Sequence, residues 1–211
     1  MALRLKQTYP RLSQSFYSGD DILFQSRCLL GMHLCTFIAG RFTSGAIVEA
    51  EAYQAPDDKA CHAYGNRLTK RTEVMFRTGG VAYIYLCYGV HHMFNVVTGP
   101  AGKAQAILIR AVQPEEGLNH MLQRRKMSKV NSRLTSGPGA LGQALGMHTQ
   151  YSGAELTAPQ TKIWIEDRGF PVEESKIQSG PRVGVASAGH CATWNWRFWI
   201  SDNPWVSRWR A

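Results

Sequence analysis

The sequence predicts one domain of mixed α/β (α+β) structure, and three observations lead to this prediction. The chain has 211 residues, and a domain commonly holds about 100–200. Hydrophobic residues make up 44% of it, enough to bury a core, which excludes a disordered chain. Some segments alternate apolar and polar residues, which predicts strands, and others lie between residues typical of helix caps, which predicts helices. Neither a glycine period nor a sustained heptad is present, which excludes collagen-like and coiled-coil folds.

The N-terminal residues, 1–17, are expected to form an arm, because they are polar and basic and lack periodicity. The domain itself is expected to span residues 18–211. Its first helix is predicted over ILFQSRCLL (22–30), since Asp21 can cap the start and Gly31 follows the end. Short runs rich in β-branched and aromatic residues predict four strands, at 46–53, 81–88, 93–98 and 105–112.

The second half of the chain continues the mixture. A helix is predicted to open at Pro114-Glu115-Glu116 and to close on Arg124-Arg125-Lys126, because acids at its start and bases at its end suit the helix dipole. SGPGALGQALG (136–146) predicts a turn that leads into a short helix. The last strands are expected at RVGVASAG (182–189) and WNWRFWI (194–200).

The charge of the chain indicates an anionic partner. Lys and Arg number 24 against 15 Asp and Glu, a formal net charge of +9, and nucleic acid is the commonest polyanion. An anionic membrane surface is the other candidate, but the sequence has no basic amphipathic helix with a long apolar face. The longest apolar stretch, 81–90, is about half of a membrane span. We therefore expect no membrane partner.

The cysteines and the N-terminus predict the location. Five cysteines form no C-x-x-C pair, which favours reduced thiols over a disulfide framework. The first sixteen residues lack the apolar run of a signal peptide. We therefore expect a protein that is not secreted but cytoplasmic or nucleoid-associated, or nuclear if the organism is eukaryotic.

Three charged residues interrupt apolar strands. Glu49 and Glu51 share one face of the predicted strand 46–53, and Arg110 stands alone among apolar neighbours in 105–112. Burying a charge is costly unless the charge is paired. We therefore expect Arg110 to meet Glu49 or Glu51 across the sheet or a cleft. The alternative is a purely structural ion pair, or an edge strand whose charges reach water.

Tyrosines recur along the strand 81–88. Tyr83 and Tyr85 share one face, and Tyr88 stands beside Gly89, where a turn can lift its side chain clear of the sheet. One interpretation is ordinary strand packing. The other is a stacking platform or wedge for nucleic-acid bases, whose stacking on aromatic rings is worth about 1–3 kcal/mol per base.

A long polar loop joins the first two predicted strands, and it holds His62 and a basic cluster of Arg67, Lys70 and Arg71. Long connections in compact domains are commonly functional, and basic side chains suit phosphates. A solvated charged loop is the alternative. No metal site is predicted, because His62, His91 and His92 lack a metal-ligand spacing and no cysteine pair assists them.

Several motifs, in order, carry a resemblance. They are IVEAEAY, Pro56 to His62, YIYLCYGVHHMFNVV, AILIRAVQPEEGL, TSGPGALGQALG, RVGV followed by AG, and RFWI followed by NPWVS. Together they cover residues 16–207, and the chain resembles the alkyladenine (3-methyladenine) DNA glycosylase family. The resemblance implies a curved, mostly antiparallel sheet with flanking helices. It also implies a monofunctional base-excision repair enzyme that flips alkylated or deaminated purines from duplex DNA and hydrolyses the N-glycosidic bond.

The resemblance also implies the partners and the roles of residues. It implies a monomer that acts on double-stranded DNA containing damaged purines, with no cofactor and no metal. Glu51 corresponds to the general base, and Arg110 with the backbone carbonyl of Val183 to the groups that hold the attacking water. Tyr53, His62 and Tyr85 correspond to the aromatic cage that holds the flipped base. Tyr88 corresponds to the wedge that fills the vacated stack, and Asn95 to the pocket amide that disfavours guanine.

Three positions depart from the family pattern, and they bear on DNA affinity and lesion range. Ala140 stands where lysine is usual, His190 where a carboxylate is common, and Asn195 where proline is frequent. Two rival functions are a non-catalytic nucleic-acid-binding module of the same fold and a carbohydrate-active hydrolase. The intact Glu51 and Arg110 argue against the first rival. The basic charge and the aromatic residues argue against the second.

Overall fold

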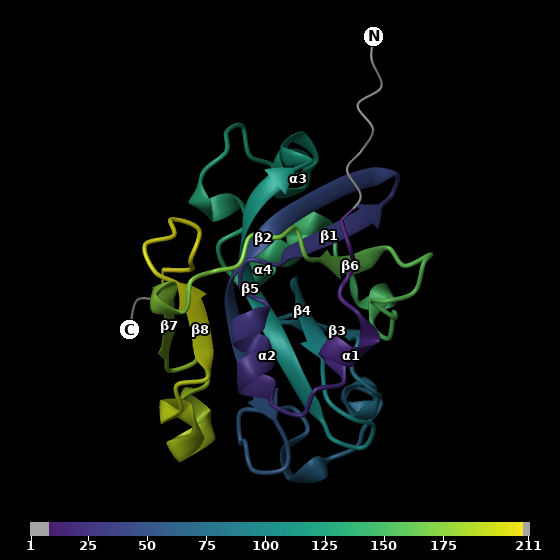
Figure 1. Cartoon of the computed structure of the whole chain (residues 1–211), viewed down its shortest axis with the longest axis vertical. Coiled ribbons are helices and arrows are strands. Elements are labelled where there is room, and N and C mark those ends of the chain that lie inside the picture. The colour runs from purple at the N-terminus through teal and green to yellow at the C-terminus, as the bar shows by residue number, and fades with distance from the viewer. Residues whose placement is uncertain (1–8, 209–211) are drawn as a thin grey trace.

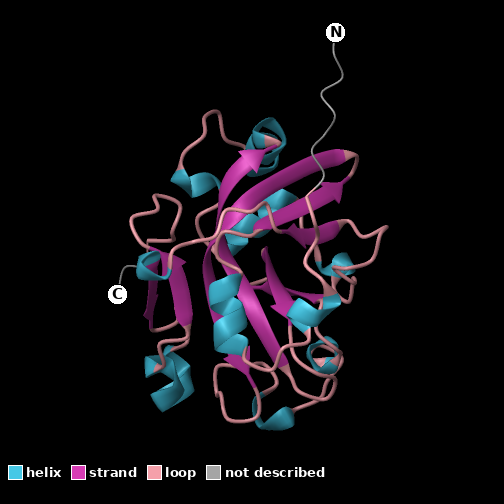
Figure 2. Cartoon of the chain, in the orientation of Figure 1, coloured by secondary structure: helices cyan, strands magenta, loops and turns pink. Residues whose placement is uncertain are grey.

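One antiparallel sheet of eight strands organises the chain, of which the computed structural model describes residues 9–208 (Figures 1 and 2). The main path runs β3-β4-β5-β2-β1-β6, and β8 pairs with both β2 and β7. The strands are β1 (His33–Ile38), β2 (Arg41–Gln54), β3 (Val81–Cys87), β4 (His91–Val97), β5 (Gln105–Glu116), β6 (Ile163–Glu166), β7 (Ile177–Gly180) and β8 (Arg197–Ile200). The sheet does not close into a barrel, and the predicted α+β class is confirmed.

The long strand β2 connects the parts of the sheet, because it pairs with three other strands. β5 runs along one of its edges. On the other edge β1 pairs with the portion that ends at Ala46, and β8 pairs with residues 49–51. Register shifts between Ile47 and Ala50 mark the change of neighbour, and such irregularities bend and twist a strand. Glu49 and Glu51 therefore lie in the middle of the sheet, where both are buried.

Helices cover the sheet. They are α1 (Gln14–Tyr17), α2 (Ile22–Cys28), α3 (Leu118–Arg125) and α4 (Pro138–Leu145). Short 3₁₀ helices lie at Tyr64–Asn66, Glu73–Phe76, Ser132–Leu134, Thr149–Tyr151, Glu174–Lys176 and Ala186–Thr193. α2 packs across β2 and β5, whereas α4 packs against β4 and β5 (Figure 1). The main core joins strand and helix side chains that are fully buried, among them Leu34, Phe94, Ile107, Ile109, Leu141 and Leu145.

Most predicted elements are present. The first helix is α2, and the Asp21 side chain caps it by accepting the N–H groups of Leu23 and Phe24 at 3.0 and 2.9 Å. The four predicted strands are β2 to β5, and the turn at 136 leads into α4. Residues 1–8 of the predicted arm lie outside the described residues. The last residues of that arm form α1, whose Tyr17 is buried.

The predicted start of the second helix at Pro114 is wrong. Pro114, Glu115 and Glu116 belong to β5, and the helix, α3, begins at Leu118 after Gly117. The strand extends because Pro114 lies opposite Gly45 beside a register shift, and irregular pairing tolerates a proline without an N–H. The two acids do not cap a helix. Both form ion pairs with Arg168, and Oε2 of Glu115 also lies 2.9 Å from Nε2 of His33.

The predicted strand at 182–189 is also wrong. Residues 181–185 form no strand but contain a turn at Val183 and Gly184, and a 3₁₀ helix follows over Ala186–Thr193. Gly184 has a φ of 76° and Gly189 one of 60°, which bend the chain out of an extended path. The last predicted strand, 194–200, is shorter than expected, since β8 covers only Arg197–Ile200.

Candidate active site

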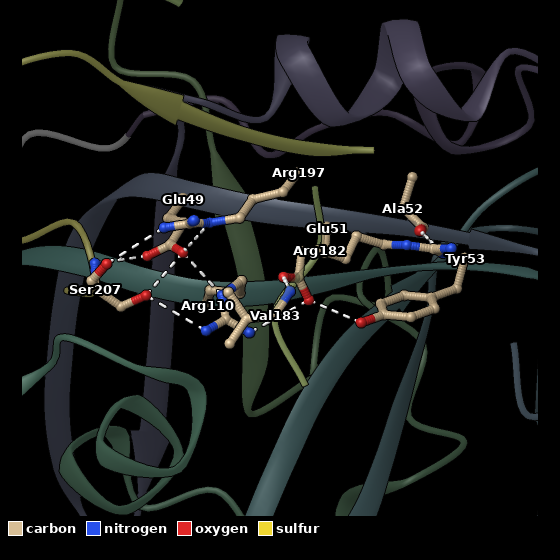
Figure 3. Close-up of polar contacts among 9 residues, drawn as sticks. All are labelled: Glu49, Glu51, Ala52, Tyr53, Arg110, Arg182, Val183, Arg197 and Ser207. Atoms are coloured by element: carbon tan, nitrogen blue, oxygen red, sulfur yellow. Dashed lines mark hydrogen bonds and ion pairs between the residues drawn. The ribbon is translucent and has the colours of Figure 1, made fainter. Parts of the chain in front are cut away.

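Arg110 joins the two buried carboxylates of β2, as the sequence predicted (Figure 3). Its Nε lies 2.8 Å from Oε1 of Glu49, and its Nη1 lies 3.2 Å from Oε2 of Glu51. Both glutamates are 0% exposed and Arg110 is 6% exposed. Burial opposes the charge on Arg110, but the two carboxylates outweigh it and raise the pKa of Arg110. Arg110 therefore keeps its charge between the two carboxylates inside the sheet.

The carboxylate of Glu51 is oriented by donors from three segments. Besides Arg110 of β5, the Tyr53 hydroxyl donates to Oε2 at 2.7 Å and the backbone N–H of Val183 donates to Oε1 at 2.7 Å. Burial, and then the adjacent Glu51, raise the pKa of Tyr53, so this hydroxyl keeps its proton. The contact of Val183 that the structure gives is thus an N–H donation, whereas the predicted role concerned its carbonyl.

An aromatic cavity of about 400 Å³ lies beside Glu51. Its lining includes the four residues that the family resemblance assigned to the base pocket, which are Tyr53, His62, Tyr85 and Asn95. Tyr83, Arg110 and Val183 also line it. The rings of His62 and Tyr85 are in contact, with centroids 4.6 Å apart at an angle of 82°. The His62 Nδ1 lies 2.9 Å from the Tyr83 hydroxyl. A buried, oriented carboxylate therefore stands next to a cavity shaped by flat rings.

Comparison with known proteins identifies the family. A family model described as methylpurine-DNA glycosylase matches residues 15–204. The chain belongs to this family. It is therefore a DNA glycosylase, a hydrolase of base-excision repair that acts on DNA, as the motifs predicted.

Relatives of similar length support the same conclusion. A protein of Chlamydia felis is 44% identical over 191 residues, which cover 90% of this chain and 96% of the relative. One of Bacillus cereus strain G9842 is 41% identical over 204 residues, which cover 92% of this chain and 97% of the relative. Both bear the name "Putative 3-methyladenine DNA glycosylase".

Tyr88 of the glycosylase stands at the tip of the β3–β4 hairpin. Its side chain is 92% exposed, and its φ of 50° lies in the left-handed region. The exposure excludes the packing interpretation for this tyrosine. Tyr83, Tyr85 and Tyr88 all belong to the lining of the cavity, and burial raises the pKa of Tyr85. The wedge role of Tyr88 stays a prediction.

Asn95 of β4 is buried in the cavity wall. Its Nδ2 donates to the carbonyl of Tyr83 at 3.0 Å and to that of Met93 at 3.3 Å. These two bonds immobilise the amide, so a rigid polar group faces whatever enters the cavity. The discrimination against guanine that the resemblance implied stays a prediction.

The basic loop divides into two parts. Arg67 and Lys70 are exposed, as phosphate contacts require. Arg71 lies against the cavity, with its Nη2 3.1 Å from Nε2 of His62 and its guanidinium 4.9 Å from the centroid of the Tyr85 ring. Desolvation, and then the charge of Arg71, lower the pKa of His62 to about 4. Phosphate binding by these three residues stays a prediction.

Sequence reasoning missed a second set of buried charges. Arg182 forms a bidentate pair with Asp58, at 2.5 and 2.7 Å, and both side chains are 0% exposed. Arg197 of β8 lies 2.8 Å from Glu49, which also accepts bonds from Ser207. Arg182 and Arg197 stand in apolar surroundings in the sequence, the same signal that singled out Arg110, and that criterion could have found them.

The described residues, 9–208, contain neither a metal cluster nor a membrane-spanning helix. No three His, Cys, Asp or Glu side chains among them are grouped closely enough to hold a metal ion. None of the helices in that range is long and apolar enough to cross a membrane. All five cysteines are free thiols.

Proposed function

We propose that the glycosylase flips alkylated or deaminated purines out of duplex DNA and hydrolyses their N-glycosidic bonds, with Glu51 as general base. One observation carries the proposal. Glu51 is fully buried and oriented by three donors, yet it lies beside a cavity lined by flat aromatic rings. A buried carboxylate next to a planar binding site suits removal of a base from a sugar. Departure of the base leaves an oxocarbenium-like sugar, which a carboxylate stabilises while it activates water.

The donors around Glu51 leave room for that water. Its Oε2 accepts bonds from Tyr53 and Arg110, whereas its Oε1 accepts one bond, from the N–H of Val183. A carboxylate oxygen has two lone pairs, so Oε1 keeps the capacity to accept a proton of the attacking water. The carbonyl of Val183, in the same residue as that N–H, is the proposed hydrogen-bond acceptor for the other O–H of the water, whose hydrogen stays on the new sugar hydroxyl.

The aromatic rings are proposed to sandwich the flipped base, which requires them to separate. Atoms in contact lie about 3.5 Å apart, so a planar base between two rings needs about 7 Å. His62 and Tyr85 are 4.6 Å apart at present. His62 is held by its bonds to Tyr83 and Arg71, and entry of a base would break one or both. A cationic alkylated purine would gain cation–π attraction from the rings.

The proposed substrate is double-stranded DNA with damaged purines, 3-methyladenine among them, since the relatives are named for that base. Tyr88 is the proposed wedge that fills the vacated stack. Arg67, Lys70 and Arg71 are the proposed phosphate contacts, and Arg71 also contacts the cavity residues His62 and Tyr85. The glycosylase is proposed to work as a monomer in the cytoplasm or on the nucleoid.

The test is release of the base from a panel of duplexes, each with one lesion, with the free base identified by mass spectrometry. Glu51→Gln should abolish release, a loss of about 10²–10⁴ in rate, while it binds lesion DNA within a few-fold of the wild type. Retained release by Glu51→Gln would assign the base to another residue. Binding without release by the wild type would favour the non-catalytic module, and cleavage of oligosaccharides would favour the carbohydrate hydrolase.

A companion assay addresses the fate of the sugar. A lyase step needs an amine that forms a Schiff base, and β2, β3 and β5 contain no lysine. We therefore expect an intact strand with an abasic site. A covalent adduct trapped by borohydride would refute the monofunctional assignment.

A further inference from the structure

Glu49 is a second buried carboxylate beside Glu51. Glu51 bonds three residues that line the aromatic cavity, Tyr53, Arg110 and Val183, whereas Arg110 is the only lining residue that Glu49 bonds. Figure 3 shows Glu49 with Arg197 and Ser207 at one end of the cluster, and Glu51 with Tyr53 at the other. We propose that Glu49 is a positioning residue, which holds Arg110 in place and takes up part of its charge, so that Glu51 remains an effective proton acceptor. The inference rests on the proposed function, because it gives Glu49 a part in the reaction of Glu51.

The partners of Glu49 set it apart from the cavity, because Arg110 is the only one of them in the cavity lining. Its Oε1 lies 2.8 Å from Nε of Arg110, 2.8 Å from Nε of Arg197 and 2.8 Å from the Ser207 hydroxyl. Its Oε2 accepts the backbone N–H of Ser207 at 2.7 Å. Four donors surround this carboxylate, and it is 0% exposed. All the bonds of Glu49 are thus to residues of the protein's interior cluster, whereas the three donors to Glu51 all belong to residues that line the cavity.

Arg110 is fixed along its whole guanidinium. Nε bonds Glu49, Nη1 bonds Glu51, and Nη2 lies 3.3 Å from the Ser207 hydroxyl. A guanidinium is a rigid planar fork, so three contacts at three nitrogens define its plane. Two of these contacts come from Glu49 and from the serine that bonds Glu49. Loss of Glu49 would thus release the end of Arg110 that lies away from the cavity.

The sharing of charge is the second part of the role. One guanidinium serves two carboxylates, at 2.8 Å for Glu49 and 3.2 Å for Glu51. An opposite charge nearby stabilises a carboxylate and makes it a poorer proton acceptor. If Glu49 were neutral, Arg110 would act on Glu51 alone, and Arg197 would lose its partner carboxylate. Both changes add positive potential at Glu51, so it would ionise more readily and accept a proton less readily.

Other charged and titratable groups around Glu51 do not reverse this expectation. Tyr53 of β2 keeps its proton, and burial also raises the pKa of Tyr85 on β3. Arg182 interacts with Glu51 at longer range, but its charge is met by Asp58. The net effect of removing Glu49 is therefore an excess of positive charge.

The experiment compares pH–rate profiles of single-turnover base release from a duplex with one hypoxanthine. Glu49→Gln keeps the shape of the side chain and removes its charge. We expect its acidic limb to move to lower pH by about one unit. We expect its plateau rate to fall by about 10- to 100-fold, because misplacement of about 1 Å can cost that much. Binding of the same duplex should stay within a few-fold.

Two further variants separate charge from shape. Glu49→Asp keeps the charge but shortens the reach, so its rate should fall while its acidic limb stays at the wild-type pH. Glu166→Gln is the matched control. Glu166 lies on the distant strand β6 and also forms an ion pair with an arginine, Arg168. Its profile should be that of the wild type.

Glu49→Gln could fail to fold, since it leaves two arginines with one carboxylate less. The double variant Glu49→Gln with Arg197→Gln then replaces it, because it removes one charge of each sign and still leaves Arg110 facing Glu51 alone. Its acidic limb should move in the same direction but by less, because the positive charge of Arg197 is removed as well. A soluble variant whose limb stays at the wild-type pH, and whose drop in rate equals its unfolded fraction by circular dichroism, would overturn the inference. Full activity of Glu51→Gln would instead overturn the proposed function, so the two failures are distinguishable.

Discussion

Replacing Tyr88 by alanine tests whether the β3–β4 hairpin acts as a wedge. Tyr88 is 92% exposed, so its removal costs little packing, and the fold should stay intact. Alanine also avoids the flexibility that glycine would add at a φ of 50°. Any effect of the substitution must therefore arise in the complex with DNA, where the ring replaces one stacking contact.

The magnitude follows from that single contact. Base–aromatic stacking is worth about 1–3 kcal/mol, which corresponds to about 5- to 150-fold. Tyr88→Ala should weaken capture of a lesion in duplex DNA by this factor. A lesion in a bulge or single strand should be captured almost normally, because little stacking is broken there.

The matched control is Tyr85→Ala, because Tyr85 lines the cavity and contacts His62. This variant should lose activity on duplex and single-stranded substrates alike. The assay combines single-turnover release with the fluorescence of a 2-aminopurine beside the lesion, which reports unstacking. Equal losses on both substrates for Tyr88→Ala would refute the wedge.

Four other predictions follow from the charges. Arg67→Ala should flatten the dependence of DNA affinity on salt and lower its slope by about one, the share of a single phosphate; an unchanged slope in binding titrations would contradict this. His62 should stay neutral as pH falls from 8 to 5, because its pKa is lowered to about 4. Arg71→Ala should raise the pKa of His62. The chemical shifts of the imidazole measure this pKa in the wild type and in the variant, and a titration midpoint near 6.5 in the wild type would contradict the prediction. Asp58→Asn should destabilise the fold by about 3–5 kcal/mol, because it leaves Arg182 buried without its partner; urea unfolding measures this, and a change below about 1 kcal/mol would refute it.

The sequence predicted the parts of the site that lie on regular strands. In β2 and β5 the side chains alternate and the apolar background is uniform, so Glu49, Glu51 and Arg110 stood out as misplaced charges. Their pairing followed from the cost of an unpaired buried charge. The cavity residues were reached through the family motifs, because strand spacing alone cannot distinguish a packed tyrosine from a pocket tyrosine.

Other features depend on pairing that local sequence does not contain. Glutamates after a proline suit a helix start, but pairing with β2 extends β5 through Glu116. The segment at 182 has an apolar alternation, yet the positive φ of Gly184 turns it toward Glu51. β1 is almost wholly buried, and β6 has only four residues, so neither shows the alternation of a half-exposed strand. Their existence depends on the neighbours that complete their hydrogen bonds.

The bonds between Glu49 and Ser207 span 158 residues of sequence. During synthesis, Glu49 leaves the ribosome long before its partner does, and Arg110 emerges between them. A nascent chain that already contains β2 to β5 still lacks Arg197 and Ser207, the later partners of Glu49. Contacts of such sequence separation form late and slow folding, so a chain that stops short of β8 cannot form the finished cluster. Assembly order thus couples activity to completion of this domain, and prematurely terminated products should be inert toward DNA bases.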